Sequence, residues 1–271
     1  MTIHINKYRE GFPLGITEIT RYDEAEDNTG IALTVHKLSA NEIYNTTTDV
    51  ETAWLLMRGE VTINIEGKNY RLTRQSLFDE SPKCLHVSAK TIVQFNCHSD
   101  TEFTVYQVPN RKRFVYKIYN DVTNEHRGKG QVGGACLRFV RTIFDLKNTD
   151  PNAELVLGEV VTMPGRWSSY PPHHHPQPEI YHYRFTHPQG YGHAEHGEDV
   201  YKIKQFDTVK IFDGNDHPQT AAPGYGMWYS WVIRHLPDNP YTVPEFTPEH
   251  TWTQSSDAQI WFPEELEGNE Y

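Results

Sequence analysis

The sequence lacks three features that each mark a class of protein: a long apolar run, a basic patch and a cysteine framework. No apolar run in its 271 residues approaches membrane-spanning length, and the first residues contain no apolar signal core. The formal net charge of −11 argues against nucleic acid, whose phosphates call for a basic surface. Three irregularly spaced cysteines indicate reduced thiols. We therefore predict a cytoplasmic protein with neither a membrane nor a nucleic-acid partner.

Aromatic residues, proline and glycine are plentiful instead. The chain is 13% aromatic and has 17 prolines and 18 glycines, which favours many short strands joined by turns over long helices. The one helix that we expect is a short acidic piece at residues 262–267. A chain of 271 residues can hold one large β domain or two domains of ordinary size.

Strand-like segments occur in two series of similar length. The first series contains residues 31–38, 52–57, 61–67, 85–87 and 103–108. Turns are expected within it at Arg58-Gly59-Glu60 and Glu66-Gly67-Lys68. The second series contains residues 142–145, 155–162 and 227–233. This repetition predicts an all-β fold of two units, residues 1–120 and 121–271, arranged as a double barrel or sandwich.

The second unit carries a candidate metal site. His173, His175 and Glu179 form a His-x-His-x3-Glu pattern, and His217 follows a later glycine-containing turn. In a strand, side chains two apart share a face, so His173 and His175 can point inward while His174 points away. A mixed nitrogen and oxygen set suits a divalent metal ion; we expect zinc, with manganese, iron, nickel or cobalt as alternatives. The simpler reading of the histidine run is a solvated loop that binds metal only adventitiously.

The first unit offers no comparable pattern. Its histidines stand singly, at His4, His36, His86 and His98, and ten of the fifteen histidines lie beyond residue 170. We therefore expect no metal in the first unit, which would serve as a scaffold. Because the edges of open sheets tend to be covered, this unit should pack against the second unit or against a symmetry-related copy, which would make the protein a homo-oligomer.

Longer strings around the histidines resemble a known family. The block from His173 to Glu179 with its later Gly-x2-His is similar to the two motifs of the cupin superfamily, small β-barrels that hold one metal. Residues 165–175, 179–185, 213–218 and 222–225 resemble more specifically the 5-deoxy-glucuronate isomerase family of bacterial inositol catabolism. The match covers the C-terminal half well, and the N-terminal half only by length and strand order. Departures lie at His174, where the family usually has Lys, at Pro176-Gln177, where acidic residues are usual, and at Trp231.

This resemblance implies two fused cupin barrels, a bicupin, with His173, His175, Glu179 and His217 as metal ligands in the second. It implies a sugar-acid substrate and an aldose–ketose isomerase, an intramolecular oxidoreductase that interconverts 5-deoxy-glucuronate and 5-dehydro-2-deoxy-gluconate. Three alternatives remain open: an isomerase of a related uronic acid, a non-catalytic sugar-acid-binding cupin, and an oxygen-using iron enzyme. No Gly-rich loop of a nucleotide-cofactor site is present.

Aldose–ketose isomerisation sets the chemistry that the site must supply. A proton next to a carbonyl has to be removed and the resulting enediolate stabilised, and a divalent cation can do the second task as a Lewis acid. Candidates for proton transfer are Tyr181, Tyr183, His182, His187 or solvent on the metal. Tyrosines on such a strand are more often core residues than catalytic ones. A metal-assisted hydride shift is the other route.

The substrate carboxylate requires a cation, and arginine is its natural partner because the guanidinium presents a planar fork of donors. Arg184 is one candidate, but it lies two residues beyond His182 on the same strand and shares the alternation of His182, so strand geometry does not force it to the side of Glu179 and Tyr181. Arg166, Arg138 and Arg141 are equally open, and each could instead be a surface residue. Tyr229, on the strand after the second motif, is a further pocket candidate.

Overall fold

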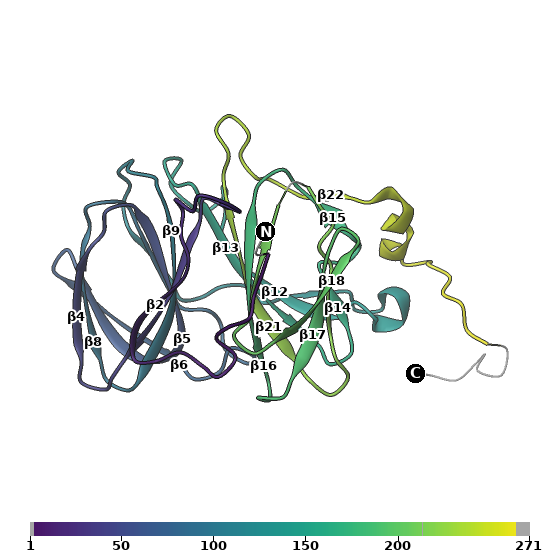
Figure 1. Ribbon diagram of the computed structural model, residues 1–271, viewed down its shortest axis with the longest axis horizontal. Helices are drawn as coiled ribbons and strands as arrows, with labels where there is room; N and C mark the ends of the chain where they lie inside the picture. Colours follow the sequence, from purple (N-terminus) through teal and green to yellow (C-terminus); the bar gives the residue numbers. More distant parts are fainter. Residues whose placement is uncertain (1–2, 213, 264–271) are drawn as a thin grey trace.

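The computed structural model describes residues 3–212 and 214–263, which form an almost entirely β protein (Figure 1). The regular elements of this part are strands, apart from two short 3-10 helices, η1 (Gln131–Gly134) and η2 (Pro248–Gln254). The expected all-β class is confirmed. Most of the helix expected at residues 262–267 lies outside the described residues, which end at residue 263. No helix in the described part is long and apolar enough to cross a membrane.

The first half of the chain forms a nine-stranded sheet, at the left of Figure 1. Its strands are β2 (Gly15–Thr20), β3 (Ala32–Leu38), β4 (Ile43–Thr47), β5 (Glu51–Ile65), β6 (Lys68–Arg74), β7 (Cys84–Val87), β8 (Ile92–Cys97), β9 (Thr101–Val108) and β10 (Lys117–Tyr119). The long β5 pairs with β7 and β9 along its first half and with β6 and β8 along its second, so it joins both parts of the sheet.

The prediction of a turn at Arg58-Gly59-Glu60 is wrong. The chain runs straight through these residues as part of β5, and the register against β9 shifts between Leu56 and Arg58. Gly59 has a φ of 126°, and a Cβ there would lie 2.8 Å from Cα of Thr101. The glycine inside this strand therefore marks a close backbone approach beside the register shift, and not a turn. The turn at Glu66-Gly67, where both φ values are positive, is confirmed.

The second half, joined by β1 from the start of the chain, forms three further sheets. A seven-stranded sheet has the order β1 (His4–Ile5), β19 (Thr208–Ile211), β16 (Glu179–Phe185), β21 (Met227–Arg234), β13 (Leu155–Thr162), β12 (Arg138–Phe144) and β11 (Glu125–Arg127). A four-stranded sheet contains β14 (Trp167–Ser168), β20 (Gln219–Ala221), β17 (Tyr191–His196) and β18 (Asp199–Lys204). A two-stranded ladder joins β15 (His173–His174) and β22 (Glu245–Phe246). In the described part, the ladders close none of these sheets into a barrel.

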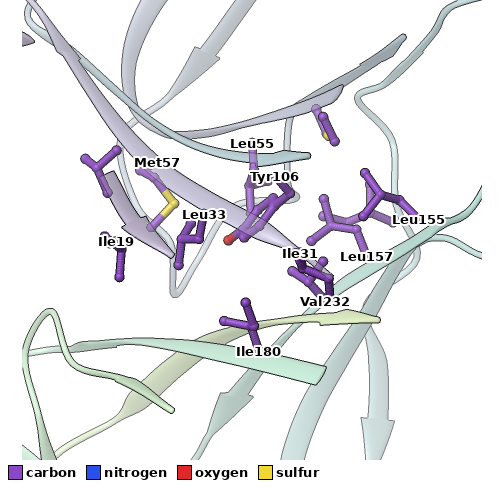
Figure 2. Close-up of a cluster of buried hydrophobic side chains, with 14 of the residues drawn as sticks. Ile19, Ile31, Leu33, Leu55, Met57, Tyr106, Leu155, Leu157, Ile180 and Val232 are labelled. Atoms are coloured by element: carbon purple, nitrogen blue, oxygen red, sulfur yellow. The ribbon is translucent and has the colours of Figure 1, made fainter. Parts of the chain in front are cut away.

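An apolar core lies between the two halves and covers one face of the seven-stranded sheet. Figure 2 shows Ile180 and Val232, from β16 and β21, directed towards Ile31 on the side of the first sheet. Because side chains alternate along a strand, Glu179 and Tyr181 lie on the opposite face of β16. That second face packs against the four-stranded sheet through a separate core. The seven-stranded sheet therefore has one structural face and one face on which a site can be built.

Candidate metal centre and its cavity

Three of the four expected metal ligands meet on that second face. One donor atom from each of His175, Glu179 and His217 lies within 4.8 Å of the other two, and all three residues are buried. Nε2 of His175 is 3.3 Å from Oε2 of Glu179, and Nε2 of His217 is 3.4 Å from the same oxygen. Glu179 opens β16, while His175 and His217 lie in the connections that follow β15 and β19.

The hydrogen bonds of the histidines fix which ring nitrogen faces the cluster. Nδ1 of His175 lies 2.8 Å from the carbonyl oxygen of Gln177, and Nδ1 of His217 lies 2.8 Å from that of Asn215. His173 repeats the pattern, with Nδ1 3.0 Å from a backbone carbonyl. A carbonyl can only accept, so Nδ1 must carry the proton in each ring. In the neutral ring Nε2 is then left with its lone pair, as in metal-binding histidines.

The donor set fits a divalent metal ion. Nε2 of His217 is buried and has no hydrogen-bond partner among the described residues, a costly arrangement that a bound cation would relieve. Burial lowers the pKa of His217 well below its usual range and that of His173 to about 4, so both rings are neutral near pH 7. Ligands at about 2.0–2.2 Å from a tetrahedral zinc lie about 3.3–3.6 Å apart, which matches the two distances to Glu179.

His173 stands beside the three-residue cluster, and His174 points elsewhere. The His173 ring lies 4.9 Å from that of His217, across the same cavity. Nδ1 of His174 lies 2.9 Å from Oδ1 of Asp216. The strand expected to run through His175 ends at His174, because Pro176 has no N–H with which to extend the ladder. His175 is turned back to the cluster by its bond to Gln177 instead of by strand alternation.

Two of the expected tyrosines lie at the cluster, and a serine joins them. Tyr181 and Tyr229 stack with ring centroids 4.7 Å apart. Oγ of Ser169 is 3.2 Å from the Tyr181 hydroxyl and 3.1 Å from that of Tyr229. Ser169 has a φ of 51°, a strained conformation for a residue other than glycine and typical of functional sites. No pattern in the sequence distinguishes Ser169 from the residues around it. Tyr183 is buried beneath the cavity and donates to Gln219.

The expected arginines occupy four different environments. Arg184, on the opposite face of β16, donates to Oε1 of Glu102 at 2.7 Å where the two halves meet, so it does not reach the cavity. Arg141 is buried against Glu159 on the same structural face. Arg166 is exposed. Arg138 alone of the four lines the cavity. His182 and His187 do not line it either; His182 faces Thr208, and His187 is exposed.

The cavity in front of the cluster has a volume of about 630 Å³, enough for a six-carbon sugar acid. One wall is Trp231, whose ring lies over Gly158; a Cβ at that glycine would be 2.2 Å from the indole. The segment between β21 and β22 crosses the cavity, and its Tyr241 ring lies 5.0 Å from the ring of His175. The ring centroid of Phe246, in β22 just after this segment, lies 5.5 Å from that of His173. Sequence patterns gave no signal for this cover.

A family comparison, a sequence comparison and a structure comparison each match most of the chain to known proteins. The model of the KduI/IolB family matches residues 8–253. A protein of Geobacillus kaustophilus named 5-deoxy-glucuronate isomerase is 27% identical over 232 residues, which cover 78% of this chain and 80% of the relative. The crystal structure of an IolB-like protein from Salmonella typhimurium LT2 superposes with a TM-score of 0.77 at 22% identity, covering 90% of this chain and 97% of that one. A cupin 2 conserved barrel domain protein from Leptotrichia buccalis gives 0.53 at 12% identity, with 85% and 95% covered.

Proposed function

Because this chain belongs to the KduI/IolB family, we propose that it is a metal-dependent aldose–ketose isomerase that converts 5-deoxy-glucuronate into 5-dehydro-2-deoxy-gluconate. The family resemblance noted in the sequence is confirmed by the family match. Within the structure, one observation carries the proposal. His175 and His217 each bond a backbone carbonyl through Nδ1 and direct Nε2 to the carboxylate of Glu179, in a cavity large enough for a sugar acid.

We propose His173, His175, Glu179 and His217 as the ligands of one divalent metal, zinc in the first place and manganese, iron, nickel or cobalt in the second. His173 is included because it lines the same cavity and shares the Nδ1-to-carbonyl pattern. Such a cation supplies Lewis-acid stabilisation of the negative charge that develops on the substrate oxygens. The metal ligands provide no proton donor in this arrangement, so that work falls to neighbouring side chains.

Tyr181 is the side chain best placed to move a proton. Its ring lines the cavity, and its hydroxyl lies within hydrogen-bond distance of Ser169. We assign the Tyr181 hydroxyl to holding the reacting carbonyl oxygen and donating its proton to it as the enediol forms, while the resulting phenolate takes up the proton that leaves the adjacent carbon, so that the tyrosine ends the step as it began. Tyr229 orients this group through Ser169, and its own hydroxyl donates a hydrogen bond to Oγ of Ser168 at 3.0 Å. Burial raises the pKa of Tyr229 to about 12, which keeps it a donor. Tyr183 acts as a positioning residue, and Arg184 is left without a role at the cavity.

The chain divides, in this proposal, into two cupin-type units, residues 1–120 without metal and residues 121–271 with it. One observation supports this boundary, and another supports the absence of metal from the first unit. β10 still pairs with β7 in the first sheet, whereas β11 already pairs with β12 in the second half. The interior of the first unit is filled by an apolar core that includes Trp54 and Phe95. β1 crosses the division, since it pairs with β19. Cytoplasmic location and assembly into a homo-oligomer stay predictions.

The direct test is to incubate purified, metal-loaded protein with 5-deoxy-glucuronate under nitrogen and to follow ketose formation by NMR. Glucuronate and related uronates run in parallel define the substrate. Conversion without oxygen, abolished by chelator and by His175→Ala, is the expected result. Turnover only in air would indicate an oxygen-using enzyme. Tight binding of a sugar acid with no conversion would indicate a binding protein instead.

A further inference from the structure

Arg138 is the first residue of β12 and faces the cavity. Side chains alternate along this strand, so Arg138 shares a face with Val140, which also lines the cavity, while Arg141 lies on the opposite face beside Glu159. Arg138, Tyr170 and His173 line this same cavity. The cavity therefore contains an arginine in addition to the proposed metal ligands.

Arg138 differs from the other arginines that are not exposed in the described part of the chain. Each of the others pairs with a carboxylate: Arg9 with Asp207, Arg74 and Arg141 with Glu159, Arg184 with Glu102, and Arg234 with Glu154. Arg138 donates only to backbone carbonyls, from Nη1 to Cys136 at 2.9 Å and from Nη2 to Tyr170 at 3.0 Å. These two bonds fix the plane of the guanidinium and use two of its five N–H groups.

A half-buried guanidinium without an acidic partner is costly, because neutral carbonyls compensate the lost hydration only in part. Burial accordingly lowers the pKa of Arg138. An anionic ligand in the cavity would satisfy the remaining donors through short, charge-assisted hydrogen bonds. The protein as a whole carries a net charge of −11, so an arginine left unpaired in this one cavity indicates a site for an external anion.

We propose that Arg138 binds the carboxylate of the sugar acid and so determines both the specificity for acids and the direction in which the sugar enters. The carboxylate end lies at β12 and the carbonyl end at His175, Glu179 and Tyr181. This inference rests on the proposed function, because it names the residue that would select the substrate class of that site. Lys129, exposed at the rim of the cavity, adds positive charge along the entry route.

A purely structural role has to be separated from binding, because Arg138 also holds the carbonyl of Tyr170, one residue beyond Ser169. The test therefore compares two sugars on the metal-loaded protein: 5-deoxy-glucuronate and 5-deoxy-glucose, in which a hydroxymethyl group replaces the carboxylate. Variants are Arg138→Met, Arg138→Lys and the control Arg166→Met, an exposed arginine outside the cavity. Measurements are kcat and KM for both sugars, metal content, and the dissociation constant of 5-deoxy-glucuronate by calorimetry.

In Arg138→Met we expect kcat/KM for the acid to fall roughly 10- to 100-fold, mainly through KM, as a charge-assisted pair is lost. The neutral sugar should be handled as by the wild type, Arg138→Lys should recover part of the loss, and Arg166→Met should change nothing. An equal fall for both sugars, or a fall in kcat with lost metal, would mean that Arg138 only shapes the Tyr170 segment. An unchanged KM for the acid would mean that another group binds the carboxylate.

The two proposals can fail separately. If the wild type binds 5-deoxy-glucuronate without converting it, the isomerase assignment fails, and the loss of affinity in Arg138→Met still decides the role of Arg138. If the wild type converts the acid and Arg138→Met retains the same KM and dissociation constant, the function stands and the role of Arg138 is refuted. If the wild type neither binds nor converts any sugar acid, both proposals are refuted.

Discussion

The hydroxyl of Tyr183 donates a 2.7 Å hydrogen bond to Oε1 of Gln219, whose Nε2 donates in turn to the backbone carbonyl of His217 at 2.7 Å. Tyr183 and Gln219 are fully buried, so water does not compete for these bonds. Through this pair, strand β16 fixes the main chain that carries a proposed metal ligand. Residues behind a metal ligand commonly set its orientation and the basicity of its ring.

We expect Tyr183→Phe to weaken metal binding about tenfold while the protein still folds, because Gln219 loses the donor that orients it. Competition with a chelator measures this change. Tyr106→Phe is the matched control, since the Tyr106 hydroxyl is also buried and donates to Ser230 at 2.7 Å outside the cavity. A similar loss of metal affinity in both variants would show a general effect of removing a buried hydroxyl.

The metal content should be one divalent ion per chain, carried by the second unit. Elemental analysis should find that the His175→Ala, His217→Ala double variant retains none. His174→Lys, by contrast, should keep the full content, because His174 contacts Asp216 outside the cluster and a lysine can also donate a hydrogen bond to that carboxylate. Loss of metal in His174→Lys, or metal retained by the double variant, would show that the ligand set is wrong.

Tyr181→Phe should lower kcat by roughly 100-fold or more and leave metal content unchanged, because a positioned proton donor contributes about that much. Steady-state kinetics on 5-deoxy-glucuronate provide the measurement. Ser169→Ala is expected to have a smaller effect in the same direction, since it removes the group that lies between Tyr181 and Tyr229. A Tyr181→Phe enzyme with wild-type kcat would leave the proton transfer to another group.

The strand content and the types of metal-ligating residue could be predicted from the sequence. The parts of the site that depend on contacts between residues far apart in the chain could not. Alternation along the strand predicted that Arg184 lies on the face of β16 opposite Glu179 and Tyr181, because the direction of successive side chains is a local property of a strand even where, as in β16, all of its residues are buried. Local patterns could not choose among four arginines, since the choice depends on which carboxylates the fold brings near: Glu102 for Arg184, Glu159 for Arg141 and none for Arg138 in the described residues. Tyr241 reaches the cavity from a segment with no regular structure, and such a segment has no periodic pattern from which its position could be predicted.

Arg184→Met should destabilise the fold and spare the site. Arg184 and Glu102 are 6% and 20% exposed at their side chains, and removing the cation leaves a poorly solvated carboxylate between the two halves. We expect a loss of about 2 kcal/mol in the free energy of unfolding from urea denaturation, with unchanged KM for the acid. The exposed pair Arg21–Asp23 supplies the control: Arg21→Met should leave the free energy of unfolding unchanged, because solvent screens this pair. A raised KM in Arg184→Met would place this arginine at the substrate after all.

His36 should make the first unit sensitive to acid. Burial lowers the pKa of this ring from 6.5 to about 4, and its Nδ1 has no hydrogen-bond partner in the described structure. Between these two pH values the unfolded chain binds a proton that the folded chain does not. The free energy of unfolding is therefore unaffected by this ring above pH 6.5 and declines as the pH falls towards 4. The shift corresponds to about 3 kcal/mol at the acid end of this window. His36→Phe, which keeps the ring packed against Tyr44, removes this titration. Urea denaturation across the window should therefore show a smaller acid loss for His36→Phe than for the wild type. His98→Phe, at an exposed position, should follow the wild-type curve; parallel curves for all three proteins would contradict the prediction.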